Sequence, residues 1–293
     1  MVEKLLGSIE AGGTKFVCAV ADFEFNEIDS AQFPTETPEV TMANVFEFFK
    51  KHEVVAIGIG SFGPIDINLE SETYGFILST PKLAWTDFDF LGAMKEKFDI
   101  PMYWTTDVNA SAYGEYVFGN AKGTNSCVYF TVGTGIGGGA IQKGEFIGGI
   151  SHAEMGHAFI SQHPADKEFE GVCPYHKNKC LEGLAAGPSL EARTGIKGEL
   201  IPQNHEVWDI LAYYIAQAAY NAVLTLAPEK IIFGGGVMGQ THLMKKVRTQ
   251  FAQINNGYIA TPELETYIVN PAIKNNGSAT IGNFALAKRL LEK

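Results

Sequence analysis

The chain has 293 residues, of which 46% are hydrophobic, so it holds enough apolar material for one large domain or two of ordinary size. Its formal net charge is −11 and only three residues are arginine, which leaves no basic stripe for a nucleic-acid surface. Signal-peptide layout, membrane-length apolar runs and a disulfide framework are all missing, so we expect a cytoplasmic protein without membrane or nucleic-acid partners.

The first part of the chain alternates apolar runs with helical patterns. Apolar residues at 5–9 and 16–20 flank Gly12-Gly13, which predicts a hairpin with glycines at its tip. Thr37 followed by Pro38 predicts the start of a helix. The expected elements are that helix to about His52, strands at 54–61 and 74–79, a helix at 88–98, a strand at 102–106 and a helix at 107–118.

A second cycle of the same kind begins near residue 127. A strand at 127–132, a glycine turn at 133–139 and a returning strand at 140–142 repeat the order of the first hairpin, which indicates an internal duplication. Alternating strands and helices with short connections are typical of the α/β class. The remaining expected elements are a buried helix at 206–226, a strand at 230–233 and helices at 242–254 and 278–291.

Four potential metal ligands lie within 24 residues in the middle of the chain and read H-x15-C-x2-H-x3-C. They are His157, Cys173, His176 and Cys180. Two thiolates and two imidazoles complete a tetrahedral Zn²⁺ site with no open position, so the predicted zinc is structural. The segment between the ligands has little apolar periodicity and needs such a staple to be ordered. The zinc would support a loop that presents Glu154 and Glu182 to a polar ligand.

Three glycine turns follow apolar strands, at 12–15, 133–139 and 234–236. Such turns free backbone N–H groups for binding anions, and the side chains of Thr14, Lys15 and Thr134 would add donors for phosphate oxygens. An ordinary hairpin is the alternative for any one of them.

The spacing Gly133-x-Gly135-x-x-Gly138 also matches the dinucleotide-binding fingerprint. That fingerprint must open a helix, whereas the residues that follow here are strand-like. This context argues against a nicotinamide-dependent oxidoreductase. The G-x-x-x-x-G-K-[ST] phosphate loop does not occur in the sequence.

Taken together, these motifs resemble the ROK family of sugar kinases over nearly the whole chain. The matching segments are 10–15 and 133–138 for the phosphates, 107–110 for catalysis, 154–157 and 180–183 for sugar and zinc, and 234–237 for adenosine. The resemblance implies an actin/hexokinase-like (ribonuclease H-like) duplicated two-lobe α/β fold with the active-site cleft between the lobes. The smaller lobe would contain 1–118 and 277–293, the larger 119–276 with the zinc loop, and hinges would lie near 118–124 and 275–278.

The resemblance also implies roles for particular residues. Asp107 would be the base that deprotonates a sugar hydroxyl, although an Asp at the start of a helix is also a common N-cap. The implied sugar contacts are Ser61, Asn109, Glu154, His157 and Glu182. The implied nucleotide contacts are Gly12, Gly13, Thr14, Lys15, Gly133, Thr134, Gly135, Gly187, Pro188, Gly235, Gly236, Val237, Met238 and Gly239. Mg²⁺ would accompany ATP, Zn²⁺ would be structural, and the protein would form a homodimer.

Several departures from the wider family resemble its fructokinase branch. They are Thr106 before the catalytic Asp, the mixed Cys/His zinc loop, and the segments 61–66 and 80–85. The implied reaction is ATP-dependent phosphorylation of a hexose at its 6-hydroxyl, D-fructose first, with a glucose or mannose kinase as the alternative. A sugar-sensing repressor of the family would carry an added DNA-binding helix pair, and the intact Asp107 argues against it. Trp85 in the second segment is either core or a sugar platform.

Overall fold

The computed structural model describes residues 4–274 and 277–292, and it divides into two compact units. The first unit contains the residues up to Lys122, the short segment Phe146–His152 and the residues from Ile273 onward. The second contains Gly123–Glu145 and Ala153–Ala272. Part of the second expected hinge, residues 275–276, lies outside the described residues.

The sheet of the first unit has five strands in the order β3-β2-β1-β4-β7. The strands are β1 (Leu5–Ala11), β2 (Lys15–Ala21), β3 (Glu27–Pro34), β4 (Val54–Ser61) and β7 (Met102–Thr106). The first three form an antiparallel meander, and β4 and β7 then add in parallel to β1. A small ribbon of β5 (Phe76–Ile77) and β6 (Phe88–Asp89) lies outside this sheet.

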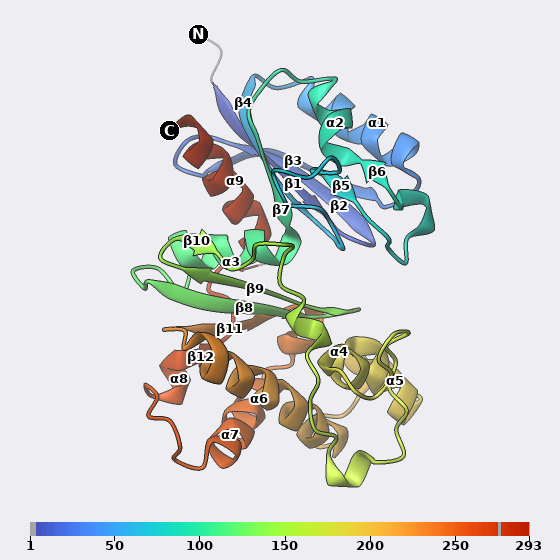
Figure 1. Ribbon diagram of the computed structural model, residues 1–293, viewed down its shortest axis with the longest axis vertical. Coiled ribbons are helices and arrows are strands. Elements are labelled where there is room, and N and C mark those ends of the chain that lie inside the picture. Colours follow the sequence, from blue (N-terminus) through green and yellow to red (C-terminus); the bar gives the residue numbers. More distant parts are fainter. Residues whose placement is uncertain (1–3, 275–276, 293) are drawn as a thin grey trace. The chain divides into compact units, whose positions relative to one another are not determined.

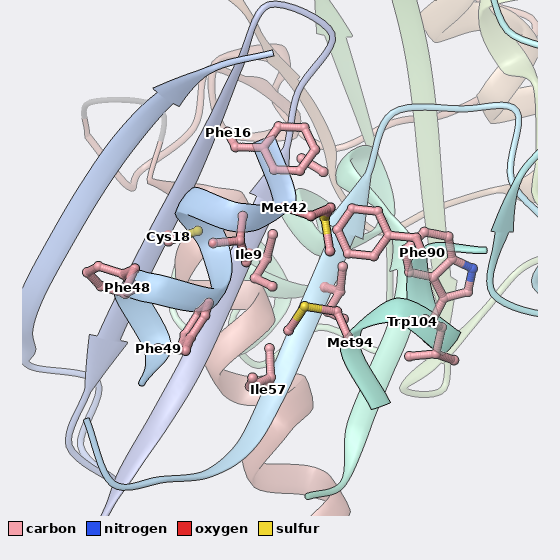
Figure 2. Packing of buried hydrophobic residues seen from close by; sticks show 14 of the residues in the cluster. Ile9, Phe16, Cys18, Met42, Phe48, Phe49, Ile57, Phe90, Met94 and Trp104 are labelled. Carbon is pink, nitrogen blue, oxygen red and sulfur yellow. The ribbon is translucent and has the colours of Figure 1, made fainter. Parts of the chain in front are cut away.

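Helices cover both faces of this sheet (Figure 1). They are α1 (Pro38–Phe49), α2 (Phe90–Lys95), α3 (Asp107–Val117) and α9 (Ser278–Leu291). Residues from α1 and α2 pack on one face, where Phe16 and Ile57 from the strands meet Met42, Phe49 and Phe90 (Figure 2). Leu6, Ala19 and Ala56 face the other way and pack on Phe284 of α9. A sheet buried on both faces explains why its strands read as continuous apolar runs.

The sheet of the second unit repeats the same arrangement, with the order β10-β9-β8-β11-β12. Its strands are β8 (Ser126–Val132), β9 (Ile136–Gln142), β10 (Glu145–Phe146), β11 (Ile231–Gly234) and β12 (Ile268–Val269), and the last residue of β10, Phe146, is where the segment assigned to the first unit begins. An antiparallel hairpin is again followed by two parallel strands. The predicted α/β duplication is therefore confirmed.

Five α-helices are described in the second unit. They are α4 (Leu181–Ala185), α5 (Gly187–Thr194), α6 (Val207–Leu226), α7 (Leu243–Asn255) and α8 (Leu264–Tyr267). Figure 1 shows α6, α7 and α8 together on one side of the sheet. The predicted burial of α6 is confirmed, because Trp208, Leu211 and Ile215 are all fully buried. Among the described residues we find no helix that combines the length and apolarity needed to cross a bilayer.

Two predicted elements differ from the structure, and one strand was not predicted. The predicted strand at 74–79 is only the two residues of β5. The helix expected at 88–98 begins later, because the Asp89 side chain accepts a hydrogen bond from the Gly92 amide (2.7 Å) and so caps a helix that starts at Phe90. The sequence analysis also missed β3, whose residues are mostly exposed and carry no apolar run.

The glycine turn expected at 133–139 is also shorter than predicted, since β9 begins at Ile136. Three glycines of this run lie inside the strand, opposite Tyr129, Phe130 and Thr131 of β8. A Cβ placed at Gly138 would lie 2.9 Å from the Cβ of Met155, so this glycine allows the loop at 154–157 to approach the sheet closely.

Candidate active site and zinc centre

Two carboxylates gather at one end of the first sheet. In the parallel register Glu10 of β1 lies beside Gly60 of β4, Gly60 lies beside Thr105 of β7, and Asp107 follows the end of β7. Gly60 has no side chain to separate them, and a Cβ there would come within 3.2 Å of the Asp107 Cα. Burial, and then the negative charge of Asp107, raise the pKa of Glu10 to about 7, against a smaller lowering by Lys15.

Asp107 is the first residue of α3, and the cap of that helix is supplied by its neighbour. The Thr106 hydroxyl accepts a hydrogen bond from the Asn109 amide at 3.1 Å, so Thr106 is the N-cap and not Asp107. One oxygen of Asp107 accepts the adjacent Val108 amide at 2.8 Å, and the residue is half-buried. The carboxylate therefore lies at the head of a helix, where the N-terminal partial charge is positive.

Two of the predicted sugar contacts, Ser61 and Asn109, are buried inside the first unit. The Ser61 hydroxyl is fully buried and donates to the carbonyl of Phe62 at 2.9 Å. The Asn109 side-chain amide donates to the Thr105 hydroxyl at 3.1 Å, and the residue is 3% exposed. These hydrogen bonds tie both side chains to neighbouring groups of the first unit.

The first glycine turn, at 12–14, is tied to its own sheet. The Gly12 amide donates to the Lys15 carbonyl at 3.0 Å. Thr35, which follows β3, donates its amide to the Thr14 carbonyl (2.9 Å) and its hydroxyl to the Gly12 carbonyl (2.7 Å). Thr14 and Lys15 are exposed, and the Lys15 ammonium donates to the Gln32 side chain at 3.1 Å.

The sequence analysis missed Lys82 as a neighbour of this turn. Its Cε would lie 3.9 Å from a Cβ placed at Gly13. Lys82 is held by its chain neighbour Trp85, whose amide donates to the Lys82 carbonyl (2.8 Å) and whose indole N–H donates to the Glu36 carbonyl (2.7 Å). Trp85 is 1% exposed among aromatic side chains, so it belongs to the core and is not a sugar platform.

The second glycine turn, at 133–135, is tied to residues far along the chain. The Gly187 amide donates to the Gly133 carbonyl at 2.7 Å, and the Ile136 amide donates to Oε2 of Glu182 at 2.9 Å. A Cβ at Gly187 would lie 3.5 Å from the Val237 side chain. Three predicted nucleotide segments therefore meet at one end of the second sheet; they are 133–135, 187–188 and 235–239.

Gly235 is required at this meeting point. Its φ of +89° lies in a region that favours glycine, and a Cβ there would come within 2.5 Å of the Val132 carbonyl oxygen. Only glycine at position 235 therefore lets the loop after β11 approach the end of β8 this closely. The short helix η5 (Gly236–Gly239), which contains Val237 and Met238, begins directly after it.

The four predicted zinc ligands converge. One ligand atom from each of His157, Cys173, His176 and Cys180 lies within 4.8 Å of the others. The His157 Nδ1 lies 3.8 Å from both sulfurs, and the His176 Nδ1 lies 3.9 Å from the Cys173 sulfur. These separations are a few tenths of an ångström longer than the S···N edge of about 3.5 Å in a tetrahedron with Zn–S of about 2.3 Å and Zn–N of about 2.0 Å, so a small inward movement would close the site on an ion.

The surroundings of the two sulfurs also fit a thiolate–metal site. Backbone N–H groups of His176 and Gly183 each point at a cysteine sulfur, at 3.4 Å. Cys173 and Cys180 are 1% and 0% exposed, and burial raises the pKa of the Cys180 thiol to about 11. A divalent cation would favour the deprotonated thiolates. The residues present therefore fit a structural zinc ion.

His157 connects this quartet to the predicted sugar contacts. Its Nδ1 faces the sulfurs, and its Nε2 lies 3.9 Å from Oε1 of Glu182, whose other oxygen holds the second glycine turn. The Glu154 carbonyl accepts the His157 amide at 3.0 Å at the start of the short helix η2 (Met155–His157), and Glu154 itself is exposed. The structure thus brings His157 and Glu182 together beside the zinc loop, with Glu154 one turn away.

A duplicated pair of sheets, each ending in a glycine turn, defines a fold of the actin/hexokinase type. The chain belongs to the ROK family, whose model matches residues 6–290. It is 57% identical to a fructokinase of Streptococcus mutans serotype c over 293 residues, which are 99% of each chain. It is 58% identical to a fructokinase of Lactococcus lactis subsp. cremoris over 288 residues, which are 98% of each chain.

Solved structures agree with this fold. A ROK hexokinase from Thermus thermophilus superposes with a TM-score of 0.79 at 22% identity, over 98% of this chain and 99% of that one. A ROK family glucokinase from Streptomyces griseus, solved with glucose and AMPPNP, gives a TM-score of 0.77 at 23% identity, over 97% of this chain and 99% of that one.

Proposed function

We propose that this protein is an ATP-dependent fructokinase, which transfers the terminal phosphoryl group of ATP to the 6-hydroxyl of D-fructose. The observation that carries the proposal is the carboxylate of Asp107 at the head of α3, at the same end of the sheet as the first glycine turn. Full-length identity of 57–58% to two fructokinases supports fructose as the substrate.

Asp107 would act as the general base. A sugar hydroxyl is a weak nucleophile at neutral pH, so its proton must leave as its oxygen bonds to phosphorus. In the proposed step the proton passes to the Asp107 carboxylate while the bond between the terminal phosphorus and the ADP oxygen breaks. An ordinary carboxylate suffices, because the transition state of phosphoryl transfer is loose and demands little nucleophile activation.

The two glycine turns would hold the phosphates through backbone N–H groups, with Thr14, Lys15 and Thr134 as exposed side-chain donors. The adenosine would lie against 187–188 and 235–239, which meet the second turn. Mg²⁺ bound with ATP would neutralise charge on the phosphate oxygens. Glu154, His157 and Glu182 would bind sugar hydroxyls, and the structural zinc would keep the last two in place.

The test is a panel of hexoses with ATP and Mg²⁺, followed by release of ADP. We expect the highest kcat/KM for D-fructose, and ADP release that requires both the sugar and Mg²⁺. A higher kcat/KM for glucose or mannose would mean that the protein is a glucose or mannose kinase and not a fructokinase. ADP release that is independent of sugar would overturn the kinase proposal. We also propose a homodimer, which light scattering of the purified protein would test.

A further inference from the structure

The segment Phe146–His152 is a short excursion of the chain that packs on the first unit, although the residues on both sides of it belong to the second. The ring of Phe146 packs on Tyr113 (5.8 Å between centroids) and on Tyr103 (6.4 Å). At the other end His152 is only 8% exposed, whereas Ile150 between them is 97% exposed. The segment 146–152 is thus fixed at both ends, by the aromatic ring of Phe146 at one end and by the polar side chain of His152 at the other.

His152 is bound to the backbone of a distant loop. Its Nε2 accepts a hydrogen bond from the Ile65 amide at 3.2 Å, in a buried position. The same edge of the ring packs on Gly63, since its Cε1 and Nε2 would lie 3.4 and 3.5 Å from a Cβ placed there. Accepting an N–H at Nε2 requires a ring that is unprotonated at that nitrogen.

The loop held by His152, residues 62–65, leaves the first sheet at the carboxylate pair. Ser61, the last residue of β4, is paired on one side with Ala11 and on the other with Thr106, the residue before Asp107. The Phe62 amide still donates to the Ala11 carbonyl at 2.7 Å, so the loop begins in register with the sheet. Beyond that point the two flanking strands β1 and β7 offer the loop no further pairs. Its carbonyl side is held at Pro64, which accepts the Leu78 amide at 2.8 Å, and its amide side at Ile65 is held by His152.

We propose that His152 is a positioning residue for sugar binding: it holds the backbone of residues 63–65 beside Asp107 and thereby sets the affinity for the hexose. This inference rests on the proposed kinase function. Ser61 and Asn109 use their side-chain donors within the first unit, and the loop continues directly from Ser61, which pairs with Thr106, the residue before Asp107. Without the bond to His152, the buried Ile65 amide would lose its partner, and the loop would keep only its backbone bonds at Phe62 and Pro64.

Two substitutions separate this role from simple structural support. His152→Leu removes the acceptor but keeps an apolar side chain, whereas His152→Gln keeps an acceptor oxygen. We expect His152→Leu to raise the KM for the hexose about tenfold, the effect of leaving a buried donor unpaired. The KM for ATP should change less than twofold, and His152→Gln should recover most of the loss. His52→Leu is the matched control, since His52 belongs to the same unit but bonds Asp29 at its surface.

Hydrogen exchange of the Ile65 amide gives a second readout that does not depend on turnover. It should speed up at least tenfold in His152→Leu and return toward the wild-type rate in His152→Gln. An unchanged hexose KM in both variants, or equal effects on hexose and ATP, would overturn the proposal. The kinetics use whichever hexose the wild type prefers, so failure of the fructose assignment is separate from failure of this inference. Unchanged exchange at Ile65 would overturn it even for a protein without kinase activity.

Discussion

The two glycine turns occupy equivalent places in two sheets of the same strand order, yet they are held in different ways. The turn at 12–14 is fixed by Thr35, which follows the edge strand of the same sheet. The turn at 133–135 is fixed by Glu182 and Gly187, which lie about fifty residues further along and directly after the four predicted zinc ligands. One turn is stabilised within its sheet and the other through the metal loop.

This difference shows how a duplicated scaffold acquires unequal halves. The first unit contributes the carboxylate pair, because Gly60 leaves room between neighbouring parallel strands. The second contributes a carboxylate, Glu182, that is shared between a glycine turn and His157, one of the four predicted zinc ligands. Substitution of the carboxylates in the first unit should therefore lower the rate of phosphoryl transfer. Loss of the metal should instead displace the glycine turn at 133–135.

The largest effect should follow from the loss of the base. Asp107→Asn keeps the side-chain volume and the cap at Thr106 but cannot take a proton, so kcat should fall by about 10²–10⁴-fold. Binding of ATP, measured by calorimetry, should remain within about threefold of wild type. Asp99→Asn, at an exposed carboxylate of the same unit, is the control. A kcat for Asp107→Asn close to wild type would assign the base to another group.

The next effect should come from the zinc loop. Cys180→Ser removes one of four ligands, and we expect zinc content to fall and activity to drop by about 10–100-fold, because Glu182 and the second turn lose their support. Proteolysis should then begin within 159–180, as metal analysis and mass spectrometry would show. Cys127→Ala, at a buried cysteine of the same unit outside the quartet, should keep its zinc. Full activity after verified zinc removal would contradict the supporting role.

Most of the fold could be predicted because the strands that form it are buried on both faces. Strands β1, β4 and β8 read as apolar runs that end in turn residues, and the repeated order of strand, glycine turn and strand indicates the duplication. The edge strand β3 could not be predicted in this way, because it exposes most of its polar side chains. Strand β12 has two residues, too few for any periodicity.

The site was predictable where its residues are close in sequence. All four zinc ligands fall within one short segment, and their spacing alone indicates that they converge. The contact of His152 with Ile65 spans 87 positions, and no spacing rule connects the two. The inward orientation of Ser61 and Asn109 depends on local hydrogen bonds to Phe62 and Thr105 that a polar residue type does not reveal.

A pH-dependent effect on stability should follow from Glu10 in the ligand-free protein. Its pKa rises from 4.5 to about 7 on folding, so the folded state holds its proton more tightly than the unfolded state does. This group therefore adds no penalty below pH 4.5, and it lowers stability progressively between pH 4.5 and 7. The full penalty above pH 7 is about 3 kcal/mol.

Glu10→Gln removes that penalty. The variant should melt at a higher temperature than wild type at pH 8, and the difference should shrink toward zero as the pH approaches 4.5. Differential scanning calorimetry without nucleotide or Mg²⁺ measures both. Glu70→Gln, at an exposed carboxylate of the same unit, should show no such trend. A variant that is less stable than wild type at pH 8 would mean that other groups of the folded protein stabilise the ionised carboxylate of Glu10.

The smallest effect should come from the support of the first turn. Thr35→Val keeps the shape of the side chain and the backbone bond to Thr14 but loses the hydroxyl bond to the Gly12 carbonyl, at a cost of about 1 kcal/mol. We expect a KM for ATP raised about threefold, since backbone bonds still hold most of the turn. Thr35→Ser, which keeps the hydroxyl, should behave as wild type. Because this turn is fixed within its own sheet, neither substitution should change zinc content or the protease sensitivity of 159–180. A change in either would mean that the two turns are not supported independently.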